Sequence, residues 1–115
     1  MTRVSVQIQW PDGVDLPPGA RARVTVEDVT EADASGRVLG ETVLEGLSTG
    51  TPAVAEVDVP DVEPQALVVA RVQVTPVRRD LAGIEEGDLI STQSHPVLTR
   101  GHGDSVVVPL TKVGG

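Results

Sequence analysis

The sequence predicts an all-β fold, in the form of a two-sheet antiparallel β-sandwich of about seven strands. Apolar and polar residues alternate in repeated short segments, and turns that contain proline or glycine separate these segments. No stretch has a convincing long helical pattern, and 22 valines beside one tryptophan, no phenylalanine and no tyrosine predict a β-branched core. A small closed β-barrel is the alternative, because strand patterns do not reveal whether a sheet closes on itself.

The first two expected strands have the strictest alternation, within a single domain that spans residues 1–115. The first strand starts at Arg3 and points four apolar side chains to one face: Val4, Val6, Ile8 and Trp10. A turn over 11–13 and a rigid connector over 16–19 follow. The second strand covers 20–27 and points four small apolar side chains to one face: Ala20, Ala22, Val24 and Val26.

Five further strands, one of them interrupted, complete the expected sandwich: 37–47, 53–59, 67–75, 88–93 with 96–98, and 105–110. Residues 37–47 also fit a helix, but Gly40 and Gly46 favour a strand. Residues 67–75 are apolar on most of both faces, which predicts a central strand. Loops or turns are expected over 28–36, 76–87 and 101–104, and four more valines are expected to point inward: Val72, Val74, Val106 and Val108.

Charge and composition exclude several functions. A net charge of −8 repels a phosphate backbone and one tryptophan offers little base stacking, so we expect no nucleic-acid binding. No apolar run approaches the roughly 20 residues of a transmembrane helix, so we expect no membrane insertion. Strand-like alternation from Arg3 leaves no room for a signal peptide. A cytoplasmic location is therefore expected, or a periplasmic or outer-membrane-associated one if an upstream signal peptide has been removed.

Two acidic segments are candidates for cation binding. The first holds four carboxylates within seven residues: Glu27, Asp28, Glu31 and Asp33. The second holds three, which we expect to be exposed beside a turn at Gly87: Glu85, Glu86 and Asp88. Neither has the spacing of a calcium-binding loop, so we favour solvated loops. A small-ligand or metal-binding module that uses the loops 28–36 and 78–88 remains the alternative function.

The sequence predicts no enzyme, and we assign no catalytic, cofactor-binding or metal-ligating residue and no cofactor. His95 and His102 with Asp104 could hold zinc, but their spacing matches no known zinc motif. No cysteine nucleophile exists, and Ser94 is not in a nucleophile motif. The glycines at 101 and 103 follow no strand-to-helix switch and do not predict a phosphate-binding loop.

The carboxyl end carries a pair of glycines, Gly114 and Gly115. Ubiquitin-like and sulfur-carrier proteins end in this way, but they wrap their sheet around a helix that this sequence does not predict. With 12 glycines in the chain, we interpret the pair as accidental.

Several segments resemble the YbaY/YscW-like lipoprotein family. Residues 16–20 (LPPGA), the strand that follows and the acidic run 27–33 (EDVTEAD) are similar to the distinctive first part of that family. Residues 67–72 (LVVARV) resemble a later strand, and 88–93 and 95–99 resemble its last third. The resemblance covers about residues 3–112.

The resemblance implies a β-sandwich of the kind found in bacterial envelope lipoproteins, including pilot proteins of type III secretion secretins, with no enzymatic activity. The lipidated cysteine is absent, and Leu67 and Val54 stand where the family usually has aromatic residues. We therefore expect a non-catalytic interaction or accessory domain, with a protein partner of unknown identity or self-association. The resemblance matches no partner-binding residue.

The segment 37–47 is the expected docking edge. It contains no proline, whereas the prolines of the chain lie mostly at strand ends. We expect it to form a sheet edge that accepts a strand from a partner or a second copy. Replacing Val43 with proline should then weaken association and leave most of the fold intact.

Overall fold

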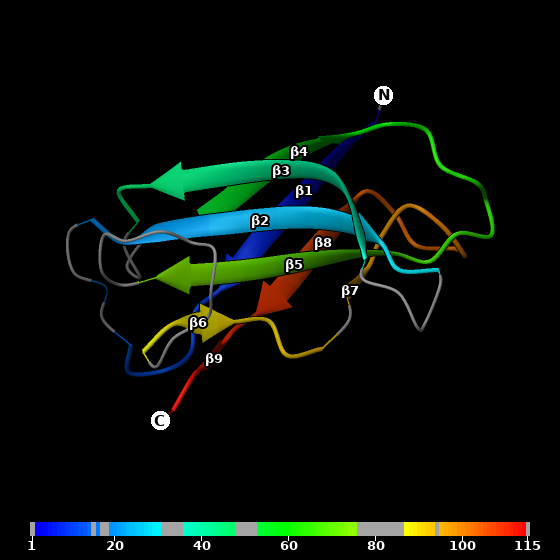
Figure 1. The fold of residues 1–115 in the computed structure, drawn as a ribbon. Coiled ribbons are helices and arrows are strands. Elements are labelled where there is room, and N and C mark those ends of the chain that lie inside the picture. The colour runs from blue at the N-terminus through cyan, green and yellow to red at the C-terminus, as the bar shows by residue number, and fades with distance from the viewer. Residues whose placement is uncertain are drawn as a thin grey trace.

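The computed structural model describes residues 2–14, 16, 19–30, 36–47, 53–75, 87–93 and 95–114. These residues form nine strands and no helix (Figure 1). The five longer strands are β1 (Thr2–Gln9), β2 (Arg21–Asp28), β3 (Arg37–Glu45), β4 (Ala53–Val59) and β5 (Val68–Thr75). The shorter ones are β6 (Leu89–Ile90), β7 (His95–Pro96), β8 (Ser105–Pro109) and β9 (Thr111–Lys112). The predicted all-β class is confirmed.

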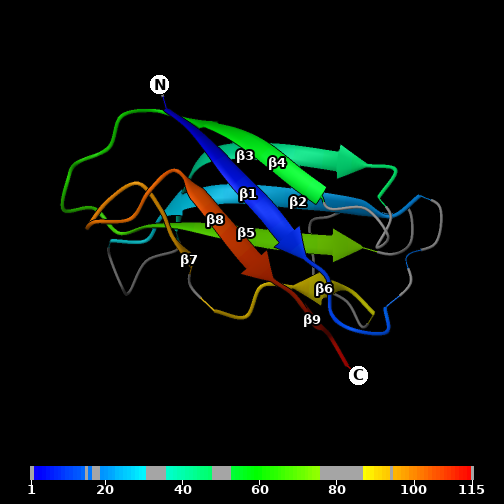
Figure 2. The same ribbon diagram turned by 180° about the vertical axis from the view of Figure 1, so that it is seen from behind.

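The strands form two sheets that pack face to face. The small sheet has the order β4-β1-β8, and the large sheet has the order β3-β2-β5-β6-β9, with β7 paired to β5 as well. Figure 2 shows the small sheet crossing in front of the large one. No ladder joins β3 to β4 in the described parts of the chain, so the sandwich, and not the closed barrel, is the observed architecture.

One strand pair departs from the antiparallel pattern. β1 and β8 pair in parallel, with Ser5 opposite Ser105 and Ile8 opposite Val108, whereas every other ladder is antiparallel among the described strands. A parallel pair needs a long connection, and here nearly the whole domain lies between the two strands. Alternation along a strand carries no information about the direction of its partner, so the sequence could not predict this pair.

The core lies between the inner faces of the two sheets. Eight of the ten side chains predicted to point inward are buried: Val4, Val6, Ile8, Val24, Val26, Val72, Val74 and Val108. Trp10 and Val106 are only partly buried, although both pack against the core. Trp10 lies just beyond the end of β1, and Val106 lies on an edge strand, so each has fewer neighbours to cover it.

The predicted edge at residues 37–47 is confirmed, because β3 pairs with β2 alone and ends the large sheet. Part of this edge is covered by the other sheet. The Thr42 hydroxyl donates a hydrogen bond of 2.7 Å to the carbonyl oxygen of Glu56 on β4. Two residues further along each of these strands, Gly40 of β3 lies against the backbone of Asp58 of β4. β3 and β4 therefore close one side of the sandwich.

The interrupted strand is confirmed as β6 and β7, which both pair with β5. Between them Ser91 holds the ladder: its amide donates to the carbonyl of Val72 at 3.0 Å, and its hydroxyl accepts from the Val72 amide at 3.0 Å. The sequence did not predict β9, which pairs with β6 on the outer side. A strand of two residues is too short to show alternation.

Candidate functional site

The first acidic segment has structural roles in its described half. Glu27 accepts a hydrogen bond from the Thr25 hydroxyl at 2.8 Å and lies 3.6 Å from the Nε of Arg71. Asp28 accepts hydrogen bonds from the hydroxyl and the backbone amide of Thr30, which together lower the pKa of Asp28 below 3.8. The other two candidate calcium ligands, Glu31 and Asp33, lie outside the described residues.

The expected exposure of Asp88 is wrong. The Asp88 side chain is buried, and the Nε2 of Gln73 donates to it at 3.4 Å. The amide of Val113 donates to the Asp88 carbonyl at 2.8 Å, so the unpredicted segment around β9 lies beside this residue. Gly87 does turn, with a φ of 92°. Glu85 and Glu86 are not among the described residues.

The candidate zinc ligands lie on different segments and differ in burial. His95 is partly buried on β7, whereas His102 and Asp104 are exposed around the turn before β8. Within the described ranges, no three histidine, aspartate or glutamate side chains are grouped closely enough to hold a metal ion. Gly114 has a φ of 77°, and Gly115 is not described.

His95 is nevertheless electrostatically sensitive. Its Nε2 atom is buried and has no hydrogen-bond partner among the described residues. Burial lowers the pKa of His95 below 6.5, because the charged imidazolium loses hydration there. The folded protein therefore holds the neutral form more strongly than the unfolded chain does.

This burial predicts a pH dependence. A depressed histidine pKa means that the stability contribution is complete above the unfolded value of 6.5 and is lost as pH falls toward the lower folded pKa. Between about pH 7 and pH 5, His95→Gln should therefore lose less unfolding free energy than the parent, measured by urea denaturation. His102→Gln, in the exposed turn, is the matched control and should follow the parent. An unchanged loss in His95→Gln would contradict the buried placement.

The outer face of the large sheet carries cross-strand ion pairs. The Nε of Arg23 lies 2.6 Å from Glu41, and the Nε of Arg21 lies 3.1 Å from Glu45. Arg23 also lines an open depression of about 150 Å³ with Arg71, Ser91 and other residues of β2, β5 and β6. Since both arginines of this depression already face glutamates, it offers no uncompensated positive charge.

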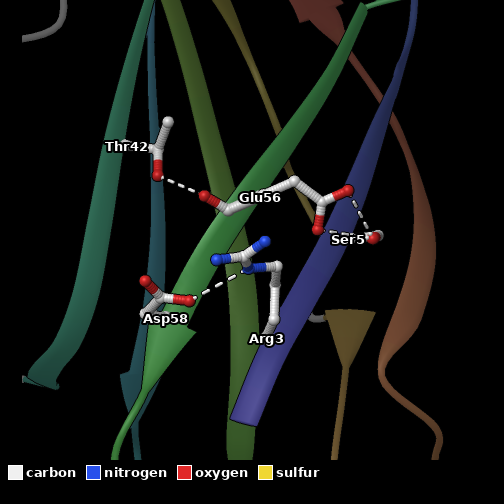
Figure 3. A network of polar contacts seen from close by, with 5 residues as sticks. All are labelled: Arg3, Ser5, Thr42, Glu56 and Asp58. Carbon is white, nitrogen blue, oxygen red and sulfur yellow. Dashed lines mark hydrogen bonds and ion pairs between the residues drawn. The ribbon is translucent and has the colours of Figure 1, made fainter. Parts of the chain in front are cut away.

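The outer face of the small sheet carries the polar network of Figure 3. Arg3 donates to Asp58 at 3.2 Å across the β1–β4 pair. The Ser5 hydroxyl lies 2.8 and 2.9 Å from the two carboxylate oxygens of Glu56, and this carboxylate makes no ion pair within the described ranges. The backbone carbonyl of Glu56 is the one that accepts from Thr42.

Two exposed valines lie on the same face. Val54 of β4 and Val107 of β8 flank Gln7 in register, and their exposed fractions are 48% and 51%. Among the described residues, the other exposed large apolar side chains are Val38 and Val43 of β3. Only the pairing of strands far apart in the chain brings Val54 and Val107 to either side of Gln7, so the sequence pattern did not reveal this arrangement.

The turn before β8 is held rigidly. Leu98 and Arg100 have positive φ angles of 67° and 56°, a region that side chains other than glycine rarely adopt. The Arg100 guanidinium donates two hydrogen bonds, of 3.1 and 2.8 Å, to the carbonyl of Gln65. The Thr99 hydroxyl donates to the carbonyl of Ala66 at 2.6 Å. These bonds fix the point at which β8 begins.

Fold and surface together define a valine-rich β-sandwich whose described polar groups mostly join neighbouring strands. Residues 1–110 match the sequence model of the type III secretion system lipoprotein chaperone family, YscW. The chain belongs to this family, and the resemblance found in the sequence is confirmed.

A solved structure supports the fold. The chain is similar to an alternative pilotin from the type II secretion system of Vibrio cholerae, with 17% sequence identity and a TM-score of 0.77. The match covers 99% of this chain and 98% of that one. No match is found among curated proteins. In the described residues, no helix is long and apolar enough to cross a membrane.

Proposed function

We propose that the protein is a non-catalytic accessory subunit of a bacterial secretion system that binds a secretin subunit. The match of residues 1–110 to the lipoprotein chaperone family carries this proposal, because it includes nearly the whole domain. The partner of this chain is by inference a protein chain, and the lipoprotein character of the family supports an encounter in the bacterial envelope. The periplasm or the inner side of the outer membrane is therefore the proposed location.

The chemistry of the described surface supports binding over catalysis. Its ion pairs join residues of neighbouring strands, such as Arg3 with Asp58 and Arg23 with Glu41, and so hold the sheets together. The depression on the large sheet is open and small beside the 300–1,000 Å³ of typical ligand sites. Exposed valines on β3, β4 and β8 offer apolar contact area instead.

Deletion of the gene in the source bacterium tests the proposal. We expect fewer secretin multimers in the outer-membrane fraction and restoration by a plasmid copy, measured by immunoblotting of unheated samples. A catalytic role would be indicated instead if the secretin multimers are unchanged while the composition of another envelope component is altered.

The metal-module alternative has its own test. Glu27 and Asp28 are occupied by Thr25, Arg71 and Thr30, so they gain little from a cation. We expect excess calcium or zinc to leave the melting temperature unchanged, since only a ligand that binds the folded state stabilises it. A rise of several degrees at micromolar metal would favour a metal-binding module over the partner-binding proposal.

A further inference from the structure

The strand β8 has one backbone edge that pairs with no other strand among the described residues. It ends the small sheet, and Figure 2 shows no strand beyond it in that sheet. Its other edge bonds to β1: the amide of Ser5 donates to the carbonyl of Asp104 at 2.8 Å, and the amide of Leu110 donates to the carbonyl of Gln9 at 3.2 Å. In a parallel pair, alternate residues bond to the same neighbour. The even-numbered residues of β8 therefore face β1, and the odd-numbered ones face away.

The free edge offers five backbone groups. These are the amide and carbonyl groups of Ser105 and Val107 and the carbonyl of Pro109, which has no amide hydrogen. A second copy would match this edge poorly. Two-fold antiparallel pairing about Val107 sets Pro109 of one copy opposite Ser105 of the other, and the Ser105 carbonyl then has no amide donor. Each copy also carries a net charge of −8, so two copies repel each other. A segment of a different protein need not have a proline at that position or a negative charge.

The edge of β3 is less accessible by comparison. Thr42 is bonded to the backbone of β4, and Gly40 is pressed against Asp58. A β-bulge between Val26 and Glu27 further disturbs its register. Strand addition along the full length of β3 would have to displace β4, whereas addition to β8 displaces no described strand.

The surface beside β8 indicates the chemistry of the added segment. Val107 is 51% exposed on the outer face, so an apolar side chain beside it in a new strand would bury its surface. Asp104, immediately before β8, has no ion pair among the described residues. Together with the net charge of −8, it favours basic side chains two residues away from the apolar one, on the same face of the new strand.

We propose that β8 binds an extended, basic segment of the partner by strand addition, with an apolar side chain beside Val107 and basic side chains two residues away on the same face, toward Asp104. The fixed turn at residues 97–104 holds the edge in place before binding, which lowers the entropic cost of association. This inference rests on the proposed function and adds the mode of partner recognition.

A synthetic peptide of ten residues is the probe, with threonine at every second position and lysine and valine taking turns at the positions between, so that lysine and valine share one face. Fluorescence anisotropy should detect its binding to the parent protein and weaker binding at high salt. N-methylation of alternate residues that bond to β8 should abolish binding, whereas methylation of the other alternate set should not.

Three variants locate the site. Val107→Pro removes the central free amide and should weaken binding about tenfold, the equivalent of one lost hydrogen bond of about 1.4 kcal/mol. Val107→Thr keeps the backbone and should bind within about threefold of the parent. Val43→Pro tests the β3 edge and should bind like the parent. Circular dichroism would check that each variant remains folded.

Several results would overturn the inference. These are absence of peptide binding, equal effects of the two methylation patterns, or a loss in Val43→Pro and not in Val107→Pro. If Val107→Pro is unfolded, the two methylation patterns on the parent protein still decide the matter. A secretin subunit that binds Val107→Pro as tightly as the parent would refute the β8 edge and leave the proposed function standing.

Discussion

Gly40→Ala should lower the free energy of unfolding by about 2 kcal/mol, within the range of 1–3 kcal/mol typical of overpacking. A Cβ atom added at Gly40 would lie 2.9 Å from the Cγ1 of Val57 and closer still to the carbonyl oxygen of Asp58. The obstacle is backbone, which cannot swing away as a flexible side chain can. The two sheets would have to separate at the corner formed by β3 and β4.

The sign of this effect makes it informative. Alanine normally stabilises the interior of a strand relative to glycine by roughly 0.5–1 kcal/mol, because glycine loses more backbone entropy on folding. Gly103→Ala is the matched control, since its added Cβ meets nothing within 4 Å, and it should be neutral. Urea denaturation measures both. A Gly40→Ala variant as stable as the parent would show that the corner is looser than described.

Leu89→Ala should cost about 2–5 kcal/mol, the range for removing a buried leucine side chain from a packed core. Leu89 is the largest of the fully buried side chains in the described residues, with 1% of its surface exposed. It stands opposite Val74 on β5 and opposite Lys112 on β9. The loss is a large fraction of the 5–15 kcal/mol that stabilises a typical domain.

Val54→Ala is the control for this variant. Val54 is 48% exposed on the small sheet, so its truncation should change the unfolding free energy by no more than about 0.5 kcal/mol. If Leu89→Ala and Val54→Ala are equally stable, β6 does not belong to the cooperative core. If Leu89→Ala is more than 2 kcal/mol less stable, the short strand is an integral part of it.

The sequence predicted the strands well because the alternation of apolar and polar residues within a strand depends only on residues that are neighbours in the chain. The segments at 37–47, 53–59 and 67–75 became β3, β4 and β5, and the central position of β5 followed from its two apolar faces. The departures began where alternation ends. Trp10 was assigned as if β1 continued through it, but β1 ends at Gln9 and the side chain is only partly covered.

Long-range pairing could not be predicted from the sequence. The parallel partnership of β1 and β8, the contact of Gly40 with β4 and the burial of Asp88 all depend on segments far apart in the chain. The docking surface has the same origin. Residues 37–47 were correctly predicted as an edge, but only the crossing of β4 shows that this edge is partly covered. The placement of the exposed Val54 and Val107 on either side of Gln7 depends on the register of three strands.

The family could be predicted from the sequence, whereas the partner-binding residues could not. The sequence match at 16–20 and 27–33 was sufficient to predict the family that residues 1–110 match. It carried no partner-binding residue. Exposed positions such as Val54 and Val107 cannot be recognised in the sequence, because the residue type is the same whether a valine lies on the outer face of a strand or in the core.

Direct binding to a secretin subunit tests the account most closely. The secretin encoded in the genome of the source bacterium would be purified in detergent, mixed with this protein at about micromolar concentrations, and examined by size-exclusion chromatography with light scattering. We expect a complex that persists through the column and weakens as salt is raised. Separate elution of the two proteins at every ratio and salt concentration would contradict it.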